Sequence, residues 1–261
     1  MFDWADKTVA ITGASSGIGE ALARRLGGKA RRLLLVARSR ARLEAISADI
    51  VGAEAVACDL ALANDRQALA TMLVDQRVDV LVNNAGVGLF GEFSKADPPR
   101  IAELLEINLQ AVVELTRALL PRLLAQGSGA IVNIASNAGL QGCPYMSVYA
   151  GAKSFLINWS EGLAGELRGT GVGVHVVCPG STRTRFFAAA GLDVTTMPVK
   201  VYQTPEDVAR EILRAVDRGR VFTITGRANR ALYYLERCVP RAVARAVTRR
   251  LFRRLKDATT E

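Results

Sequence analysis

Histidine is almost absent from this chain of 261 residues, in which His175 is the only one. A Ser-His-Asp hydrolase needs a histidine as its general base, and zinc sites usually draw on several His or Cys side chains. His175 lies between two valines in a predicted strand, where we expect a structural role. The shortage of histidine therefore argues against a triad hydrolase and against a bound metal.

Cysteine is also scarce, with four residues that are widely separated along the chain. They are Cys58, Cys143, Cys178 and Cys238. This spacing matches neither a metal-binding pair nor a disulfide framework, so we expect reduced thiols. No apolar run approaches the ~18 residues of a membrane-spanning helix, and Asp3 and Asp6 stand where the apolar core of a secretory signal would lie. These absences predict a cytoplasmic protein.

Excess positive charge is confined to the C-terminal end of the chain. Ten Lys or Arg and one acid lie between Arg227 and Lys256, a balance equal to the +9 of the whole chain. The remainder therefore carries no net charge. We predict one α/β domain over residues 1–226 and a separate basic, helical extension over residues 227–261.

A glycine-rich segment near the N-terminus stands between a predicted strand and a predicted helix. Thr12-Gly-Ala-Ser-Ser-Gly-Ile-Gly19 follows the apolar run Thr8–Ile11 and precedes a helix-like stretch that ends at Leu26. Glycines permit a tight turn and close backbone approach, and a helix N-terminus offers amide donors to a pyrophosphate. In this context the segment indicates dinucleotide binding rather than a structural turn. The candidate contacts are Gly13, Ser15, Ser16, Gly17, Ile18 and Gly19.

Tyr149 and Lys153 are four residues apart, which places both side chains on one face of a helix. A nearby cation favours the phenolate, so the pair is predicted to lower the pKa of Tyr149 and to make it an acid–base catalyst. Tyr-x-x-x-Lys spacing also occurs by chance in many helices. Its weight here comes from the nucleotide-binding segment that accompanies it.

Apolar, β-branched runs alternate with helical patterns along the chain, which indicates a single doubly wound domain of Rossmann type with a mainly parallel sheet. The predicted strands are Thr8–Ile11, Arg32–Ala37, Glu54–Cys58, Val78–Val82, Ala130–Ala135, Val172–Cys178 and Val221–Thr225. The predicted helices are Gly17–Leu26, Arg40–Val51, Leu62–Asp75, Ile101–Ala125, Val148–Arg168 and Pro205–Arg218. The expected fold class is therefore α/β, with a seven-stranded sheet.

The motifs resemble those of the short-chain dehydrogenase/reductase family, over a region from about Lys7 to Gly226. Besides the two motifs above, the matching elements are Asn83-Asn-Ala-Gly86, Asn108, Ser136 and Pro179-Gly180, in the family's order. Ser136 precedes Tyr149 by thirteen residues, which is the family's usual interval. The resemblance implies a dinucleotide-binding oxidoreductase that interconverts a carbonyl and an alcohol.

The resemblance also implies roles for four catalytic residues. Tyr149 would give a proton to the carbonyl oxygen or take one from the alcohol, and Lys153 would lower the pKa of Tyr149 and bind the nicotinamide ribose. Ser136 would hold the carbonyl oxygen where negative charge develops. Asn108 would hold a water that links Lys153 to solvent, with a role in helix packing as its alternative.

The end of the second predicted strand bears on cofactor choice, because Ala37 and Arg38 stand there. An NAD-preferring site usually has an acid at this point, whereas a guanidinium pairs well with the 2′-phosphate of NADP. The resemblance implies NADP(H), with NAD(H) as the second choice and a solvated surface role as the alternative for Arg38. Asn84 either contacts the adenosine ribose or supports the sheet. The further implied cofactor contacts are Asp59, Leu60, Ala85, Gly86, Pro179, Gly180 and Thr184.

The walls of a substrate pocket are expected in three segments, Gly86–Phe90, Ala138–Met146 and Ser181–Met197. Their apolar side chains suit a small hydrophobic carbonyl or alcohol. They are Val87, Leu89, Phe90, Leu140, Tyr145, Met146, Phe186, Phe187 and Leu192. We therefore predict an NADP(H)-dependent oxidoreductase; the alternative is a nucleotide-binding regulator or membrane-docked adaptor with little catalysis. The natural substrate, the direction and the stereochemistry stay open.

The basic extension carries an apolar stripe and a parallel stripe of arginines, both with a period of four. The stripes are Val243, Val247, Leu251 and Leu255, and Arg241, Arg245, Arg249 and Arg253. Such a helix either lies on an anionic membrane or packs on the body with its arginines in water. Nucleic acid is disfavoured, because no recognised module or aromatic interleaving accompanies the charge. The family resemblance further implies a homodimer or homotetramer, formed through the two long helices Ile101–Ala125 and Val148–Arg168.

Overall fold

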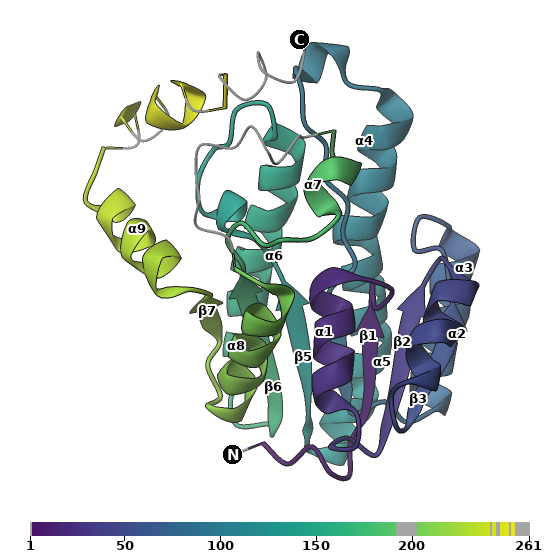
Figure 1. The fold of residues 1–261 in the computed structure, drawn as a ribbon. Helices are drawn as coiled ribbons and strands as arrows, with labels where there is room; N and C mark the ends of the chain where they lie inside the picture. Colours follow the sequence, from purple (N-terminus) through teal and green to yellow (C-terminus); the bar gives the residue numbers. More distant parts are fainter. Residues whose placement is uncertain (1, 192–202, 241, 244–245, 251, 254–261) are drawn as a thin grey trace.

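The computed structural model describes residues 2–191, 203–240, 242–243, 246–250 and 252–253. Its strands are β1 (Thr8–Thr12), β2 (Arg32–Ala37), β3 (Ala53–Ala57), β4 (Val80–Asn83), β5 (Gly129–Ile134), β6 (Val172–Cys178) and β7 (Phe222–Ile224). In these residues they form one seven-stranded sheet in the order β3-β2-β1-β4-β5-β6-β7, and every neighbouring pair is parallel (Figure 1). The predicted α/β class and Rossmann-type sheet are confirmed.

Helices cover both faces of the sheet. On one face lie α1 (Gly17–Leu26), α2 (Arg40–Ala48) and α8 (Pro205–Asp217), and Leu22, Leu43 and Ile212 from these helices share one apolar core. On the other face lie α3 (Ala63–Asp75), α5 (Ala111–Gln126) and α6 (Ser147–Glu166), whose leucines Leu73, Leu119 and Leu163 share a second core. The central strands are buried on both sides, which explains their nearly continuous apolar sequences.

The predicted helix Ile101–Ala125 is two helices joined by a wider turn. It begins earlier than predicted with α4 (Pro98–Leu105), because proline fits the first turn of a helix, and it continues into α5. Between them the π-helical turn η2 (Glu106–Gln110) contains Asn108. Such π turns are frequent at functional sites.

Three short helices in the connections that follow β4, β5 and β6 were not predicted. They are η1 (Phe93–Lys95), η3 (Asn137–Leu140) and α7 (Phe186–Ala189). Each is only three or four residues long, so none shows the repeated apolar spacing by which a helix is found in a sequence. The helix α2 also ends at Ala48 rather than at Val51, whose side chain is exposed.

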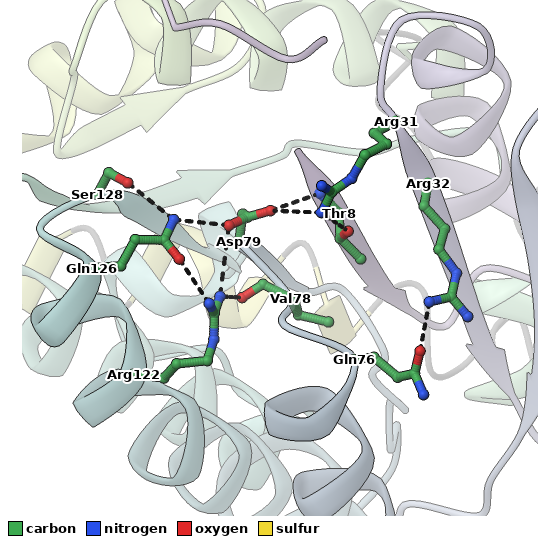
Figure 2. A network of polar contacts seen from close by, with 9 residues as sticks. All are labelled: Thr8, Arg31, Arg32, Gln76, Val78, Asp79, Arg122, Gln126 and Ser128. Carbon is green, nitrogen blue, oxygen red and sulfur yellow. Dashed lines mark hydrogen bonds and ion pairs between the residues drawn. The ribbon is translucent and has the colours of Figure 1, made fainter. Parts of the chain in front are cut away.

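The amino-terminal edge of the sheet is held together around the buried carboxylate of Asp79 (Figure 2). The backbone amide of Thr8 donates to Asp79 Oδ2 over 2.9 Å, and Gln126 Nε2 donates to Oδ1 over 2.9 Å. Arg122 and Arg31 add ion pairs at 3.6 and 3.8 Å. This network joins the starts of β1 and β4 to the end of α5 and leaves the opposite edge, at the carboxyl ends of the strands, for a ligand.

His175 has the structural role that its surroundings predicted. It is buried in β6, and its Nδ1 lies 2.8 Å from the carbonyl oxygen of Arg220. Burial lowers the pKa of the imidazole, which favours the neutral ring. The ring therefore ties β6 to the segment that leads into β7.

The C-terminal extension is mostly helical where it is described, apart from residues 238–240. It contains α9 (Arg227–Arg237) and further helical residues at 242–243, 246–250 and 252–253. The stripe proposed to be its apolar face is not the buried one, because Val243 and Val247 are 50% and 64% exposed while Thr248 is buried. Arg241, Arg245, Leu251 and Leu255 lie outside the described residues. No helix in the described part of the chain is long and apolar enough to cross a membrane.

Candidate active site

A cavity of about 850 Å³ opens at the carboxyl ends of the strands. Loops that follow β1, β4, β5 and β6 meet there, which is where open parallel sheets bind their ligands. Of the site residues proposed from the sequence, all except Gly19 and Asn108 line it. The lining set is Gly13, Ser15, Ser16, Gly17, Ile18, Arg38, Asp59, Leu60, Asn84, Ala85, Gly86, Ser136, Tyr149, Lys153, Pro179, Gly180 and Thr184.

The glycine-rich segment forms a tight turn, here called the cradle, in which Gly13 and Gly19 have no room for a side chain. Gly13 and Gly17 have φ angles of 67° and 59°, a backbone region that favours glycine. A Cβ on Gly13 would lie 2.8 Å from Ala85 Cα, and one on Gly19 would lie 2.5 Å from the carbonyl oxygen of Gly13. Glycine at these positions lets the turn pack closely on its neighbours, and Ser16, Gly17 and Ile18 at the N-terminus of α1 line the cavity. Backbone amides at a helix N-terminus can bind a pyrophosphate, so the residues present fit a dinucleotide.

Asn84 supports this cradle from the neighbouring strand. Its side-chain amide donates to the carbonyl oxygens of Thr12 and Gly13 over 2.8 and 3.3 Å. The backbone amides of Asn84 and Ala85 both donate to Thr12 Oγ1 over 3.0 Å. These hydrogen bonds show that Asn84 supports the loop after β1, and its contact with the adenosine ribose stays a prediction.

Arg38 stands at the rim of the cavity, with its guanidinium 3.2 Å from Glu103 Oε1 on α4. The side chain is 61% exposed, and no acid follows β2 directly. Arg42, in the first turn of α2, also lines the cavity and was not found from the sequence. The signal that could have revealed it is the run of arginines that follows β2, at Arg38, Arg40 and Arg42.

The loop that contains Asp59 and Leu60 is held by a buried arginine that was also not found from the sequence. Arg66 on α3 donates from its Nη1 to the carbonyl oxygens of Leu60 and Ala61 over 3.0 and 3.1 Å. Its other nitrogens contact Glu106 and Glu114 at 2.7 Å each. One side chain thus fixes this cavity wall to the π turn and to α5, and paired carboxylates satisfy its buried charge.

Tyr149, Ser136 and Lys153 converge in the middle of the cavity. Tyr149 and Lys153 lie on the first turns of α6, and Ser136 follows β5. The phenol forms a side-chain hydrogen bond with Ser136, whose Oγ also accepts from the amide of Ala138 over 3.1 Å. Lys153 Nζ donates to the carbonyl oxygen of Ile134 over 2.8 Å and lies 5.8 Å from the centre of the Tyr149 ring.

The predicted lowering of the pKa of Tyr149 is wrong for the protein without cofactor. Burial raises the pKa of the phenol to about 12, against the smaller opposing effect of the hydrogen bond from Ser136. Burial likewise lowers the pKa of Lys153 to about 8, since a charged amine is costly away from water. Spacing along the helix reveals the attraction between the two groups but not the desolvation that both undergo.

Asn108 is fully buried, and its side chain forms hydrogen bonds with both the backbone amide and the carbonyl oxygen of Val87. Its Nδ2 donates to the carbonyl oxygen of Val87 over 2.8 Å, and its Oδ1 accepts from the amide of Val87 over 3.0 Å. A Cβ added to the neighbouring Gly86 would lie 3.0 Å from Asn108 Oδ1 and 3.4 Å from Lys153 Nζ. Asn108 therefore positions the cavity wall next to Lys153, and a relay water on it stays a prediction.

The side of the cavity next to Tyr149 is apolar. Val87, Leu140, Met146, Phe186 and Phe187 line it as the sequence suggested, and the Phe186 ring lies 5.2 Å from that of Tyr149. Leu89, Phe90 and Tyr145 lie behind this lining or beside it, and Leu192 is outside the described residues. Cys143, within the predicted wall Ala138–Met146, also lines the cavity. Three further lining residues lie outside the predicted segments, namely Leu232, Tyr233 and Phe252.

Comparison with known proteins agrees with this geometry. The family model described as short chain dehydrogenase matches residues 7–194. The ketoacyl reductase HetN of Nostoc sp. is 37% identical over 222 residues, which cover 80% of this chain and 75% of that protein.

Two solved structures are also similar. A short-chain dehydrogenase from Sphingobium yanoikuyae, in complex with NADPH, has 37% identity and a TM-score of 0.80 over 84% of this chain and 87% of that one. The bulky-bulky ketone specific alcohol dehydrogenase from Comamonas testosteroni has 30% identity and a TM-score of 0.74 over 84% of this chain and 85% of that one.

Proposed function

This chain belongs to the short-chain dehydrogenase/reductase family, and from that premise we propose that it is an NADP(H)-dependent oxidoreductase that interconverts a carbonyl and an alcohol on a small hydrophobic substrate. The observation that carries the proposal is one continuous cavity. It joins a glycine cradle for a dinucleotide to an apolar wall, with Tyr149, Ser136 and Lys153 between them.

The cradle and the rim support NADP(H) as the cofactor. Gly13 and Gly17 line the cavity at the N-terminus of α1, where a pyrophosphate would bind, and Arg38 with Arg42 offers two guanidinium groups to a 2′-phosphate. The Sphingobium relative was solved with NADPH, while a relative from Burkholderia phymatum, 26% identical, was solved with NAD. NAD(H) therefore stands as the second choice. When bound, the nicotinamide supplies or accepts the hydride.

The protein's own groups would move the proton. A substrate carbonyl oxygen placed beside Tyr149 and Ser136 would accept hydrogen bonds from both hydroxyls, which stabilises the negative charge that develops on it. Because burial raises the pKa of Tyr149 to about 12, the phenol holds its proton at neutral pH and is ready to act as general acid. This favours reduction of the carbonyl. Lys153 would orient the ribose, and Asn108 acts through Val87 as a positioning residue.

The apolar wall supports a hydrophobic substrate. The relative from Comamonas testosteroni is named for bulky ketones and the one from Nostoc for ketoacyl reduction. Phe186, Phe187 and Met146 offer surface to alkyl or aromatic groups on either side of a ketone. We therefore infer that a keto group flanked by apolar substituents is preferred over a small polar carbonyl.

We infer, further, a homodimer or homotetramer formed through α5 and α6. Phe155 on α6 is 43% exposed and stacks on Trp159 with ring centres 6.1 Å apart. Leu124 on α5 is also exposed. Exposed apolar side chains on these two helices would be buried if a second copy packed against them. Analytical ultracentrifugation of the purified protein measures the number of copies.

A spectrophotometric screen tests the proposed activity. Purified protein is mixed with NADPH or NADH and a panel of ketones and aldehydes of increasing apolar size, and the loss of nicotinamide absorbance is followed. We expect turnover with NADPH on bulky apolar ketones. Tight NADPH binding without turnover on any carbonyl or alcohol of the panel would instead favour the alternative, a nucleotide-binding regulator.

Replacing Arg38 with Asp should weaken NADPH binding about 10-fold or more, since charge-assisted hydrogen bonds contribute about 1.5–3 kcal/mol and the new carboxylate repels the phosphate. NADH binding should change much less. The dissociation constants of both cofactors, measured by fluorescence titration, test this expectation.

Glu103→Gln provides the matched control for the Arg38 variant. It removes the carboxylate that holds Arg38 at 3.2 Å without removing the guanidinium. We expect NADPH binding to be kept or strengthened, because Arg38 no longer has to leave an ion pair. Equal losses of NADPH and NADH affinity in Arg38→Asp would show that Arg38 supports the fold instead.

A further inference from the structure

The helix α9 has an apolar face that nothing in the described residues covers. Leu232, Tyr234 and Leu235 are 53%, 62% and 64% exposed, and the exposed alanines Ala228 and Ala231 lie among them. The helical spacing of three and four residues places this set on one side of α9. Monomeric proteins rarely expose a contiguous apolar surface of this kind unless it serves an interaction.

The opposite side of the extension is fixed to the body, so the exposed face has a defined direction. Asn229 Nδ2 donates to the carbonyl oxygen of Thr225 over 2.9 Å, and the Tyr233 ring packs 5.9 Å from that of Phe222. Further along, Gln141 Nε2 donates to Thr248 Oγ1 over 3.3 Å, and Phe252 packs against Phe90. Figure 1 shows α9 at the outer side of β7 and α8, with its far side turned away from the sheet.

Exposed positive charge accompanies the exposed apolar side chains of the extension. Beyond α9, Val243 and Val247 are exposed, and so are Arg249, Arg250 and Arg253. From Arg227 to Lys256 the chain holds ten cations and one acid. An apolar strip with arginines at its sides is the pattern of a helix that lies in the interface of an anionic membrane.

We propose that α9 and the helical residues at 242–243, 246–250 and 252–253 form a docking surface for an anionic lipid bilayer, which would place the mouth of the active-site cavity at the lipid surface. A second copy of this chain is a poorer partner, because a two-fold contact would set arginines against arginines. An anionic surface has the complementary charge. Leu232 belongs both to the exposed face and to the cavity lining, so the two apolar surfaces are continuous.

Vesicle flotation with the full-length protein tests the proposal independently of turnover. Vesicles of equal parts phosphatidylcholine and phosphatidylglycerol should carry the protein upward at low salt, and vesicles of phosphatidylcholine alone should not. Binding should fall as salt rises, since the Debye length shrinks from about 10 Å at 0.1 M to about 3 Å at 1 M. NADPH binding, measured on the same samples in buffer, shows whether the protein is folded.

Paired variants identify the surface. Arg249→Gln with Arg250→Gln should weaken vesicle binding roughly 30-fold, as expected for two cations close to an anionic surface. Leu235→Gln with Val247→Gln should weaken it about 10-fold or more, because the inserted apolar area is lost. The controls carry the same chemical changes elsewhere: Arg218→Gln with Arg220→Gln, and Val51→Gln, whose side chain is 77% exposed. These should bind like the wild type.

Three results would overturn the proposal. The first is full-length protein that ignores anionic vesicles at low salt. The second is equal weakening by the control variants, which would mean binding by charge without a specific surface. The third is a protein whose self-association, and not its vesicle binding, is abolished by Leu235→Gln with Val247→Gln, which would assign the face to a second copy of the chain.

Discussion

Tyr149→Phe is expected to reduce kcat/KM for carbonyl reduction by about 10²–10⁴-fold, the usual contribution of a general acid. The phenol is 6% exposed and shares a hydrogen bond with Ser136, so removing its oxygen removes the proton donor without opening a path for water. The ring itself stays, with its contact to Phe186 at 5.2 Å. The dissociation constant of NADPH should therefore stay close to that of the wild type.

Tyr145→Phe is the matched control, because it makes the same chemical change four residues earlier at a side chain outside the cavity lining. It should keep most of the activity. Steady-state kinetics on a ketone from the substrate screen, with NADPH titration of both variants, measures the difference. A Tyr149→Phe enzyme with wild-type kcat, or two variants with equal losses, would remove Tyr149 from the role of acid.

The fold could be predicted from the sequence because its strong signals are local. Strand, glycine-rich turn and helix follow one another between Thr8 and Leu26, and each buried strand is an apolar run bounded by turn residues. The predicted helix Pro205–Arg218 begins at Pro205 as α8, and the Thr204 hydroxyl before it accepts from the amide of Asp207 over 3.1 Å. In such places, residue identity and local structure agree without help from distant contacts.

Contacts between distant segments escaped prediction. From the sequence alone, Arg66 would be expected on the exposed surface of a helix. In the structure it is buried where α3 packs on α5, between Glu106 and Glu114. Phe252 lies more than a hundred residues after Tyr149, yet it shares the apolar cluster around that side chain. The roles of Arg66 and Phe252 depend on residues that are distant in the sequence. No local sequence pattern around either residue could therefore predict them.

The pKa of Tyr149 was predicted in the wrong direction for a related reason. Spacing along a helix shows that an ammonium lies near a phenol, but it does not show how much water surrounds them. The structure buries both Tyr149 and Lys153, and desolvation then dominates their titration. The same burial means that the charged amine of Lys153 lowers the stability of the fold, although the active site uses this residue.

Replacing Lys153 with Met is accordingly expected to reduce activity without reducing the stability of the fold. Activity should fall about 10²-fold or more, as for loss of one preorganised donor, while the melting temperature of the cofactor-free protein at pH 7 should not fall. Burial lowers the pKa of Lys153 from 10.5 to about 8, which corresponds to roughly 3 kcal/mol of cost for the charged amine at neutral pH. The lost hydrogen bond from the charged amine to the carbonyl oxygen of Ile134 offsets about 1.5–3 kcal/mol of that gain.

The stability difference between Lys153→Met and the wild type should depend on pH. Between pH 8 and 10.5 the unfolded wild type binds more protons at Lys153 than the folded protein does, so the stability of the wild type rises with pH in this window. The methionine that replaces Lys153 has no proton to lose, and the stability advantage of the variant should shrink as pH rises from about 8 to about 10.

Lys29→Met, at an exposed site, serves as control and should show neither the loss of activity nor the pH-dependent difference in stability. A Lys153→Met protein that melts several degrees lower at pH 7, by a margin independent of pH, would show that the amine stabilises the fold and that its charge is not a cost.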